Sequence, residues 1–189
     1  MKKLNLGCGH NVMDGYVNID VQELPGVDLQ LDFIKNKLPF EDGEVSEVVM
    51  YHTIEHVEKK HHYAIFSEIR RVLGSGSELF LSYPDFFNCV ERLKNATDDD
   101  RQFWEATIYG RQLVPSDYHV CVISSAYLLG ILAPLGFSKF AVAEEDDGPH
   151  YQVLRCQASE KVISREQLFY DEVYADASYP FKSEGDADE

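Results

Sequence analysis

The sequence lacks any spacing that would join its four cysteines into one site. Cys8, Cys89, Cys121 and Cys156 lie far apart, and no C-x-x-C pair occurs in the 189 residues. Cysteine zinc sites and disulfide-rich secreted domains both depend on closely and regularly spaced cysteines. We therefore expect four reduced thiols that pack as small apolar groups.

Positive charge is also scarce. The chain has 17 Lys plus Arg against 33 Asp plus Glu, which gives a net charge of −16 at pH 7. No basic cluster is larger than Lys59-Lys60 or Arg70-Arg71. Such a surface repels phosphate backbones, so a nucleic-acid partner is disfavoured. Part of the negative charge belongs to the acidic tail, Ser183 to Glu189.

Long apolar runs and repeats are absent as well. The opening MKKLNLGCGH is too interrupted for a secretory signal or a membrane span, so we expect a cytoplasmic protein without membrane contact. A chain of this length with 44% hydrophobic residues builds one well-buried core. We predict a single domain over residues 1–160, followed by a C-terminal helix and acidic tail over residues 161–189.

Strand-like and helix-like segments alternate along the chain. Apolar or Val-rich stretches predict strands at residues 2–7, 16–20, 27–33, 44–51, 78–84, 137–144 and 151–159. Helical spacing predicts a helix over residues 60–73, capped by Gly74, and another over residues 124–136. Alternation of this kind indicates an α/β sheet sandwiched by helices.

The residues that directly follow the predicted strands have the chemistry of a nucleoside site. In α/β sheets the ligand lies at the carboxyl ends of the strands. Glycines there allow close approach of the backbone, and an acid can accept two hydrogen bonds from a ribose diol. The strand-end residues are Gly7-Cys8-Gly9, Asp20, Asp32-Phe33, His52 and Tyr83-Pro84-Asp85.

These motifs resemble those of the class I S-adenosylmethionine-dependent methyltransferases. LNLGCG resembles the first motif, VNID the second with Asp20 as ribose ligand, and RRVLGSGSELFLSYPD the helix end, turn and fifth strand. The segment LDFIKNKLPFEDGEVSEVVMYHTIEHV is similar to the stretch with the adenine contact and fourth strand. The likeness covers Lys3 to Asp85 clearly and Ser124 to Ser159 more loosely. It is similar in particular to bacterial type-11-like methyltransferases, often thought to act on sugars or polysaccharide precursors.

The resemblance implies a Rossmann-like, mostly parallel seven-stranded sheet with helices on both faces and S-adenosylmethionine as cofactor. The implied cofactor-binding residues are Gly7, Cys8, Gly9, Asp20, Val21, Asp32, Phe33, Tyr51 and His52. One departure is clear, because only ten residues separate Gly9 from Asp20 where about 20 are usual. We therefore expect a shortened first crossover. Each position also has a structural alternative: a turn glycine, a capping Asp, a core Phe.

The segment YHTIEHV contains H-x-x-E-H, the spacing of an inverted zinc-protease motif. His52 falls at the end of a strand, which weakens the helix-face geometry that a zinc site needs, and no third ligand is evident from the sequence. We therefore expect no metal, and keep a zinc hydrolase only as a distant alternative. The resemblance implies that His52 faces the methyl group. Glu55 and His56 would then serve local structure.

Residues 85–123, after the fifth strand, form a long insertion rich in aromatic residues. Long loops of this kind are usually functional or disordered, and the aromatic content favours function. We interpret the insertion as a lid that selects the methyl acceptor. His119 within it is our first candidate for the catalytic base, with His52 second; a structural loop histidine is the alternative.

The sequence thus predicts a methyltransferase for a small-molecule acceptor, at a hydroxyl of a sugar or related metabolite. A methyltransferase of macromolecules (protein or RNA) is the first alternative, opposed by the acidic charge and by the absence of N-P-P-Y or D-P-P-Y after the fourth strand. A non-catalytic nucleoside-binding protein of the same fold is the second. The predicted C-terminal helix could pack on its own domain or form a homodimer.

Overall fold

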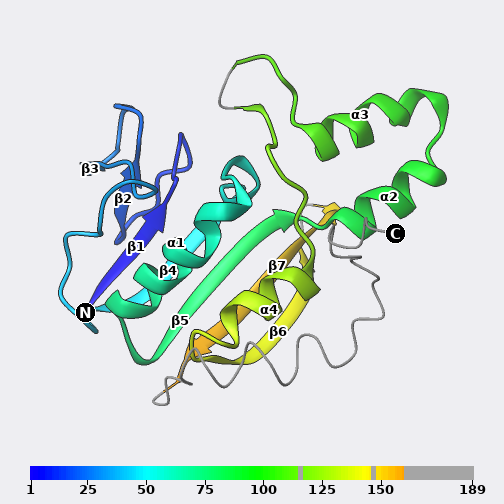
Figure 1. Ribbon diagram of the computed structural model, residues 1–189. Helices are drawn as coiled ribbons and strands as arrows, with labels where there is room; N and C mark the ends of the chain where they lie inside the picture. Colours follow the sequence, from blue (N-terminus) through cyan, green and yellow to red (C-terminus); the bar gives the residue numbers. More distant parts are fainter. Residues whose placement is uncertain (115–116, 146–147, 160–189) are drawn as a thin grey trace, which may run out of the picture.

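The structure, a computed structural model, describes residues 1–114, 117–145 and 148–159. Seven strands form one sheet in the order β3-β2-β1-β4-β5-β7-β6 (Figure 1). The strands are β1 (Lys2–Leu6), β2 (Val17–Asp20), β3 (Leu29–Gln30), β4 (Val45–Tyr51), β5 (Leu73–Pro84), β6 (Phe137–Glu145) and β7 (Gly148–Ala158). The helices are η1 (Ile54–His56), α1 (Lys59–Val72), α2 (Phe86–Lys94), α3 (Asp98–Tyr109) and α4 (Ser125–Leu132).

The first five strands pair in parallel, and β7 inserts antiparallel between β5 and β6. The predicted mostly parallel, seven-stranded, Rossmann-like sheet is therefore confirmed. Parallel pairing directs the ends of β1, β2, β4 and β5 to one edge of the sheet (Figure 1). A ligand site in such a sheet is expected at that edge, where the strands end.

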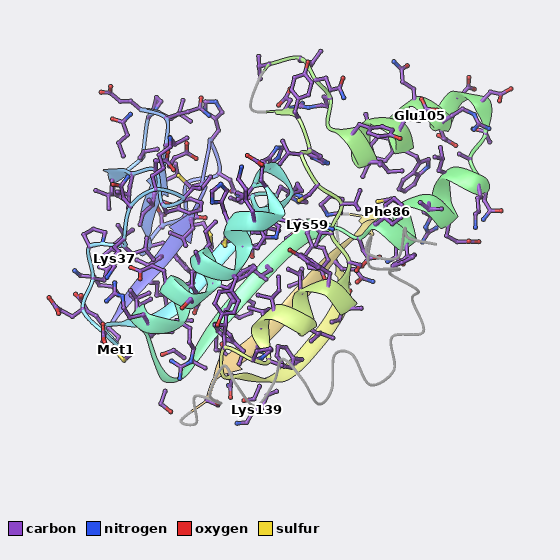
Figure 2. All side chains as sticks on the ribbon, in the orientation of Figure 1. Met1, Lys37, Lys59, Phe86, Glu105 and Lys139 are labelled. Carbon is purple, nitrogen blue, oxygen red and sulfur yellow. The ribbon has the colours of Figure 1, made fainter. Side chains whose placement is uncertain are left out.

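One face of the sheet holds the core. Leu4 of β1 aligns with Val48 of β4, which aligns with Leu79 of β5, and all three side chains are fully buried. Phe66 of α1 and Leu128 of α4 belong to the same cluster. Side chains fill the layer between these helices and the sheet, and Lys59 marks the start of α1 (Figure 2). Within the described residues, no helix is long and apolar enough to cross a membrane.

The opposite face of the sheet carries charged pairs. Lys3 Nζ of β1 lies 2.9 Å from a carboxylate oxygen of Glu47 of β4. Arg155 of β7 pairs with Glu78 of the neighbouring strand β5. Helices α1 and α4 contact each other, so both lie on the core face. The crossovers from β1 to β2 and from β2 to β3, where a doubly wound fold has helices, are loops here. The expected covering of both faces by helices is thus seen on one face in the described residues.

Two further expectations differ from the structure or fall outside it. Gly74 does not cap α1, because Leu73 already has an extended backbone and begins β5. The predicted cap was wrong since Leu73, the residue after the helix, already pairs with Val45 of β4; the register shifts before Glu78 pairs with Glu47. The predicted C-terminal helix lies outside the described residues.

The shortened first crossover is held together by the side chain of Asn18. Its Oδ1 accepts hydrogen bonds from Asn5 Nδ2 at 3.0 Å and from the backbone N–H of Met13 at 2.9 Å. Its Nδ2 lies 3.2 Å from the carbonyl oxygen of Met13 and 3.0 Å from Asp28 Oδ2. Asn5 and Asn18 are both buried. One amide thus satisfies the backbone groups that a crossover helix would otherwise satisfy internally.

We predict that Asn18→Ala destabilises the protein by about 2–4 kcal/mol, because several buried partners lose their hydrogen bonds together. Urea unfolding followed by circular dichroism measures the change. Asn95→Ala is the matched control, since the Asn95 amide bonds an exposed helix carbonyl and should change stability little. Equal stability of the two variants would contradict the role given to Asn18.

Candidate functional site

A glycine turn follows β1. Gly7 and Gly9 have φ angles of +67° and +51°, which L side chains rarely adopt. A Cβ on Gly7 would lie 2.3 Å from Cγ2 of Thr53, the second residue after β4. The Thr53 hydroxyl in turn donates to nearby backbone carbonyls, including that of Leu6 at 3.3 Å. The turn therefore requires glycine, and it exposes the backbone at the edge of the sheet.

Asp20 fixes this turn to the end of β2. Its Oδ2 accepts a hydrogen bond from the Gly9 N–H at 2.8 Å, and its Oδ1 accepts one from the Gln22 N–H at 2.8 Å. The residue is only 6% exposed. Each carboxylate oxygen can accept a further bond, so the group remains able to receive a diol. Asp20 thus has a structural task in addition to the predicted binding task.

A cavity of about 750 Å³ opens beside the glycine turn and Asp20. The predicted residues that line it are Gly7, Gly9, Asp20, Val21, Asp32, Phe33 and His52. Cys8 and Tyr51 are not among the lining residues. Cys8 is buried, and burial, reinforced by Asp20, raises the pKa of its thiol. Cys8 therefore lies within the predicted segment, but its side chain belongs to the interior.

Sequence reasoning missed other residues of this cavity. Gln22 and Ile34 line it, as do Arg111, Val114 and Tyr118 from the loop after α3. Gln22 and Ile34 each lie two residues beyond a predicted strand-end acid. They would have been included if the two residues after each acid had also been considered. The loop residues gave no such signal, because their approach depends on the tertiary path of the insertion.

The Asp32 carboxylate bonds groups of its own turn. Its carboxylate accepts from the Ile34 N–H at 3.1 Å and lies 2.6 Å from the Lys35 ammonium. The hydrogen bond from Lys35 is the main cause that lowers the pKa of Asp32. The Asp32 carboxylate thus shapes the cavity wall beside Phe33 by holding the turn.

His52 has a strained backbone. Its φ of +49° is in the left-handed region, uncommon for a residue with a side chain. Its N–H donates to the Ser82 carbonyl at 3.0 Å, and its Nε2 lies 3.3 Å from the Ser82 hydroxyl. Its Nδ1 is 3.5 Å from Glu55 Oε1. Strain of this kind persists where the surroundings impose it, and it often marks a functional position.

A second cavity of about 400 Å³ adjoins the first. His52, His56, Arg111 and Asp117 line both cavities. Glu55 and His119 line the second cavity and not the first. The structure therefore brings the predicted base candidates His119 and His52 to neighbouring walls, with His52 on the boundary.

His119 is largely shielded from solvent. Burial is the main influence on its imidazole and lowers its pKa, while the nearby Glu55 carboxylate acts in the opposite direction. Its Nδ1 is buried and has no hydrogen-bond partner. A neutral imidazole with an available nitrogen can accept a proton or bind a cation.

The predicted insertion forms the hairpin of α2 and α3 and then a loop that returns over the strand ends; Phe86 and Glu105 mark the two helices in Figure 2. Asp85 begins α2 as its N-cap and also accepts from the Ser125 N–H at 3.0 Å. Tyr83 and Asp85 are buried and line neither of the two large cavities. Tyr83 and Asp85 therefore have structural roles, whereas residues of the loop after α3 line the two cavities.

Comparison with known proteins bears on the resemblance to methyltransferases that the sequence motifs indicated. Residues 15–81 match the family model of a methyltransferase domain. No curated protein shows a significant sequence match to the chain. The predicted resemblance to class I S-adenosylmethionine-dependent methyltransferases is confirmed by the family match and by the solved structures that share the fold.

Three solved structures illustrate the shared fold. An S-adenosylmethionine-dependent methyltransferase from Archaeoglobus fulgidus has a TM-score of 0.62 at 14% identity, with 82% of this chain and 85% of that chain covered. A possible histamine N-methyltransferase from Thermotoga maritima has a TM-score of 0.56 at 17% identity, with 84% of this chain and 82% of that chain covered. Human N-acetylserotonin methyltransferase, solved with S-adenosylmethionine, has a TM-score of 0.51 at 13% identity, with 83% of this chain and 47% of that chain covered. At these identities the three likenesses establish the shared fold.

We predict that Asp20→Ala weakens S-adenosylmethionine binding by about 2–4 kcal/mol, because it removes charge-assisted acceptors for the ribose. It should also lower stability by about 1–3 kcal/mol, because the Gly9 and Gln22 N–H groups lose their acceptor. Calorimetry measures the affinity and thermal unfolding the stability. Asp14→Ala, an exposed change in the same crossover, is the control. Unchanged affinity in Asp20→Ala would remove Asp20 from the binding site.

Proposed function

We propose that this S-adenosylmethionine-dependent methyltransferase acts on a hydroxyl of a small-molecule acceptor, a sugar or related metabolite, that binds in the second cavity. The observation that carries the proposal is the boundary between the two cavities. One cavity contains the glycine turn and Asp20, the other contains His119, and they share His52 and His56. A methyl group at this boundary would face an acceptor in the second cavity.

The size and polarity of the second cavity support a small acceptor. Its volume of about 400 Å³ is in the range of small-molecule sites. Arg111 and Asp117, which lie 3.3 Å apart, add polar groups to its wall. The loop after α3 would cover a bound acceptor and so act as the lid. The net charge of −16 further disfavours RNA.

The cofactor would be held by the glycine turn, Asp20 and the residues after β3, with Tyr51 and Cys8 contributing through their place in the same segments. S-adenosylmethionine supplies an activated methyl group, so the protein mainly aligns the acceptor in line with it. A hydroxyl also gains from losing its proton during transfer. His119, or His52 at the boundary, would receive that proton.

Titration of the tag-free chain with S-adenosylmethionine and S-adenosylhomocysteine tests the first step. We expect one site per chain with either ligand, and the same affinity after treatment with a chelator, because the cofactor cavity itself contains no metal-type cluster among the described residues. Absence of binding would argue against a methyltransferase. Binding without turnover on any acceptor would favour a nucleoside-binding protein.

A screen of sugar nucleotides and glycosides for methyl transfer tests the second step. With an acceptor in hand, His119→Gln should lower turnover by about 10²–10⁴-fold and leave cofactor affinity unchanged, and His52→Gln should lower turnover by a similar factor. His61→Gln is the control, since His61 lies on α1 and lines neither cavity. Full turnover in both site variants would contradict the assignment of the second cavity to the acceptor.

A further inference from the structure

The second cavity contains a cluster of side chains that commonly bind metal ions. One ligand atom from each of Glu55, His56 and His119 can be chosen so that all lie within 4.8 Å of one another. His52 adjoins the cluster, with its Nδ1 3.5 Å from Glu55 Oε1. Two imidazoles and one carboxylate form a common ligand set for divalent transition metals.

The Glu55 carboxylate gives the strongest indication of a ligand. It is 1% exposed, and neither of its oxygens has a hydrogen-bond partner. Burial of a carboxylate without hydrogen bonds or a counter-charge is strongly unfavourable. The neighbouring His52 supplies a charge only when protonated, and its distance exceeds that of a strong hydrogen bond. A bound cation would satisfy both oxygens.

Each histidine has a ring nitrogen whose lone pair is available for a ligand. His56 Nδ1 lies 2.9 Å from the carbonyl oxygen of Tyr118, so Nδ1 must donate and Nε2 keeps its lone pair. This is the orientation that metal-binding histidines usually have. His119 Nδ1 has no partner, while the backbone of Ile108 and Thr107 bonds the imidazole. The two rings meet edge to face, with centroids 4.8 Å apart.

Backbone contacts preassemble the cluster from two distant segments. The carbonyl oxygen of Glu55 accepts from the N–H groups of Val120 and Cys121, at 3.0 and 3.4 Å. The His119 N–H donates to the carbonyl of Tyr109 at 3.1 Å. The loop after α3 is thus fixed to η1 on either side of the candidate ligands. A site that is preformed in this way loses little entropy when it binds an ion.

We propose that the Glu55 carboxylate, His56 Nε2 and His119 Nδ1 bind one divalent transition-metal ion, with His52 in reach as a further ligand. Ligand atoms around a tetrahedral ion at about 2.1 Å are roughly 3.4 Å apart, so small side-chain rotations suffice to close the cluster. The proposal departs from the sequence expectation of no metal. The H-x-x-E-H spacing was visible, but η1 is a 3-10 helix and the third ligand comes from the insertion.

The role of this ion rests on the proposed function. An ion in the second cavity would coordinate the acceptor hydroxyl and lower its pKa. The hydroxyl proton passes to water, or to His52 where this imidazole does not bind the ion, and the oxygen forms a bond to the methyl carbon. The carbon–sulfur bond breaks as this bond forms, and S-adenosylhomocysteine leaves with a neutral sulfur. The proposal therefore assigns His119 to the ion, in place of proton transfer.

Co²⁺ titration of the tag-free, chelator-treated full chain tests the site, because the visible spectrum of Co²⁺ reports its ligands. We expect one Co²⁺ per chain, displaced by Zn²⁺ and little affected by Mg²⁺, which prefers oxygen ligands. His119→Ala and Glu55→Gln should each weaken Co²⁺ binding at least about 100-fold, more than is typical for loss of an outer-shell partner. His61→Ala removes an imidazole outside the cluster and should bind Co²⁺ like the parent.

Thermal unfolding of the same proteins separates loss of the site from loss of the fold. Zn²⁺ should raise the unfolding temperature of the parent and of His61→Ala, but not that of His119→Ala. Absence of Co²⁺ binding in the parent would overturn the proposal, as would equal binding in the cluster variants, which indicates an adventitious surface ion only. Co²⁺ binding in a chain that fails to bind S-adenosylmethionine would support the site and reject the proposed function alone.

Discussion

The first cavity and the glycine turn beside it depend on one buried hydrogen-bonded pair, Asn5 and Asn18. In a fully wound fold a helix connects β1 to β2 and satisfies its own backbone groups. Here a loop makes that connection, and the Asn18 amide bonds its backbone at Met13 while Asn5 Nδ2 bonds the carbonyl of Asn11 at 2.8 Å. The loop therefore keeps a fixed path. The glycine turn and Asp20 retain their places at the strand ends although the usual helix is absent.

The second cavity depends on a different constraint, the pairing of η1 with the loop after α3. The carbonyl of Glu55 receives two N–H groups from that loop, which brings a segment more than 60 residues away into the same wall. Both cavities share residues from these two segments. Movement of the loop would change both cavities at once. Ligand binding in one cavity should therefore be coupled through the loop to ligand binding in the other, in the reciprocal sense that linkage requires.

The sequence predicted the elements whose signals are local. LNLGCG, VNID and the Val-rich fourth strand each carry their own pattern, and their ends meet because parallel strands share an edge. The position of Asp20 followed from that rule. The role of Asn18 did not, because a buried amide looks the same in sequence as an exposed one. The contact between Glu55 and His119 was also invisible, since nothing local records which loop returns to which strand end. Gly74 shows the reverse error, a local signal overridden by strand pairing.

Charge connects the proposed ion with the proposed reaction. A divalent cation beside the buried Glu55 carboxylate leaves a net charge of +1 on this pair. An alkoxide neutralises that charge, whereas the methyl ether formed by transfer does not. The sulfonium charge disappears in the same step. The ion would therefore favour the alkoxide over the neutral alcohol, and it would hold the methyl ether more weakly than the alkoxide, which favours release of the product.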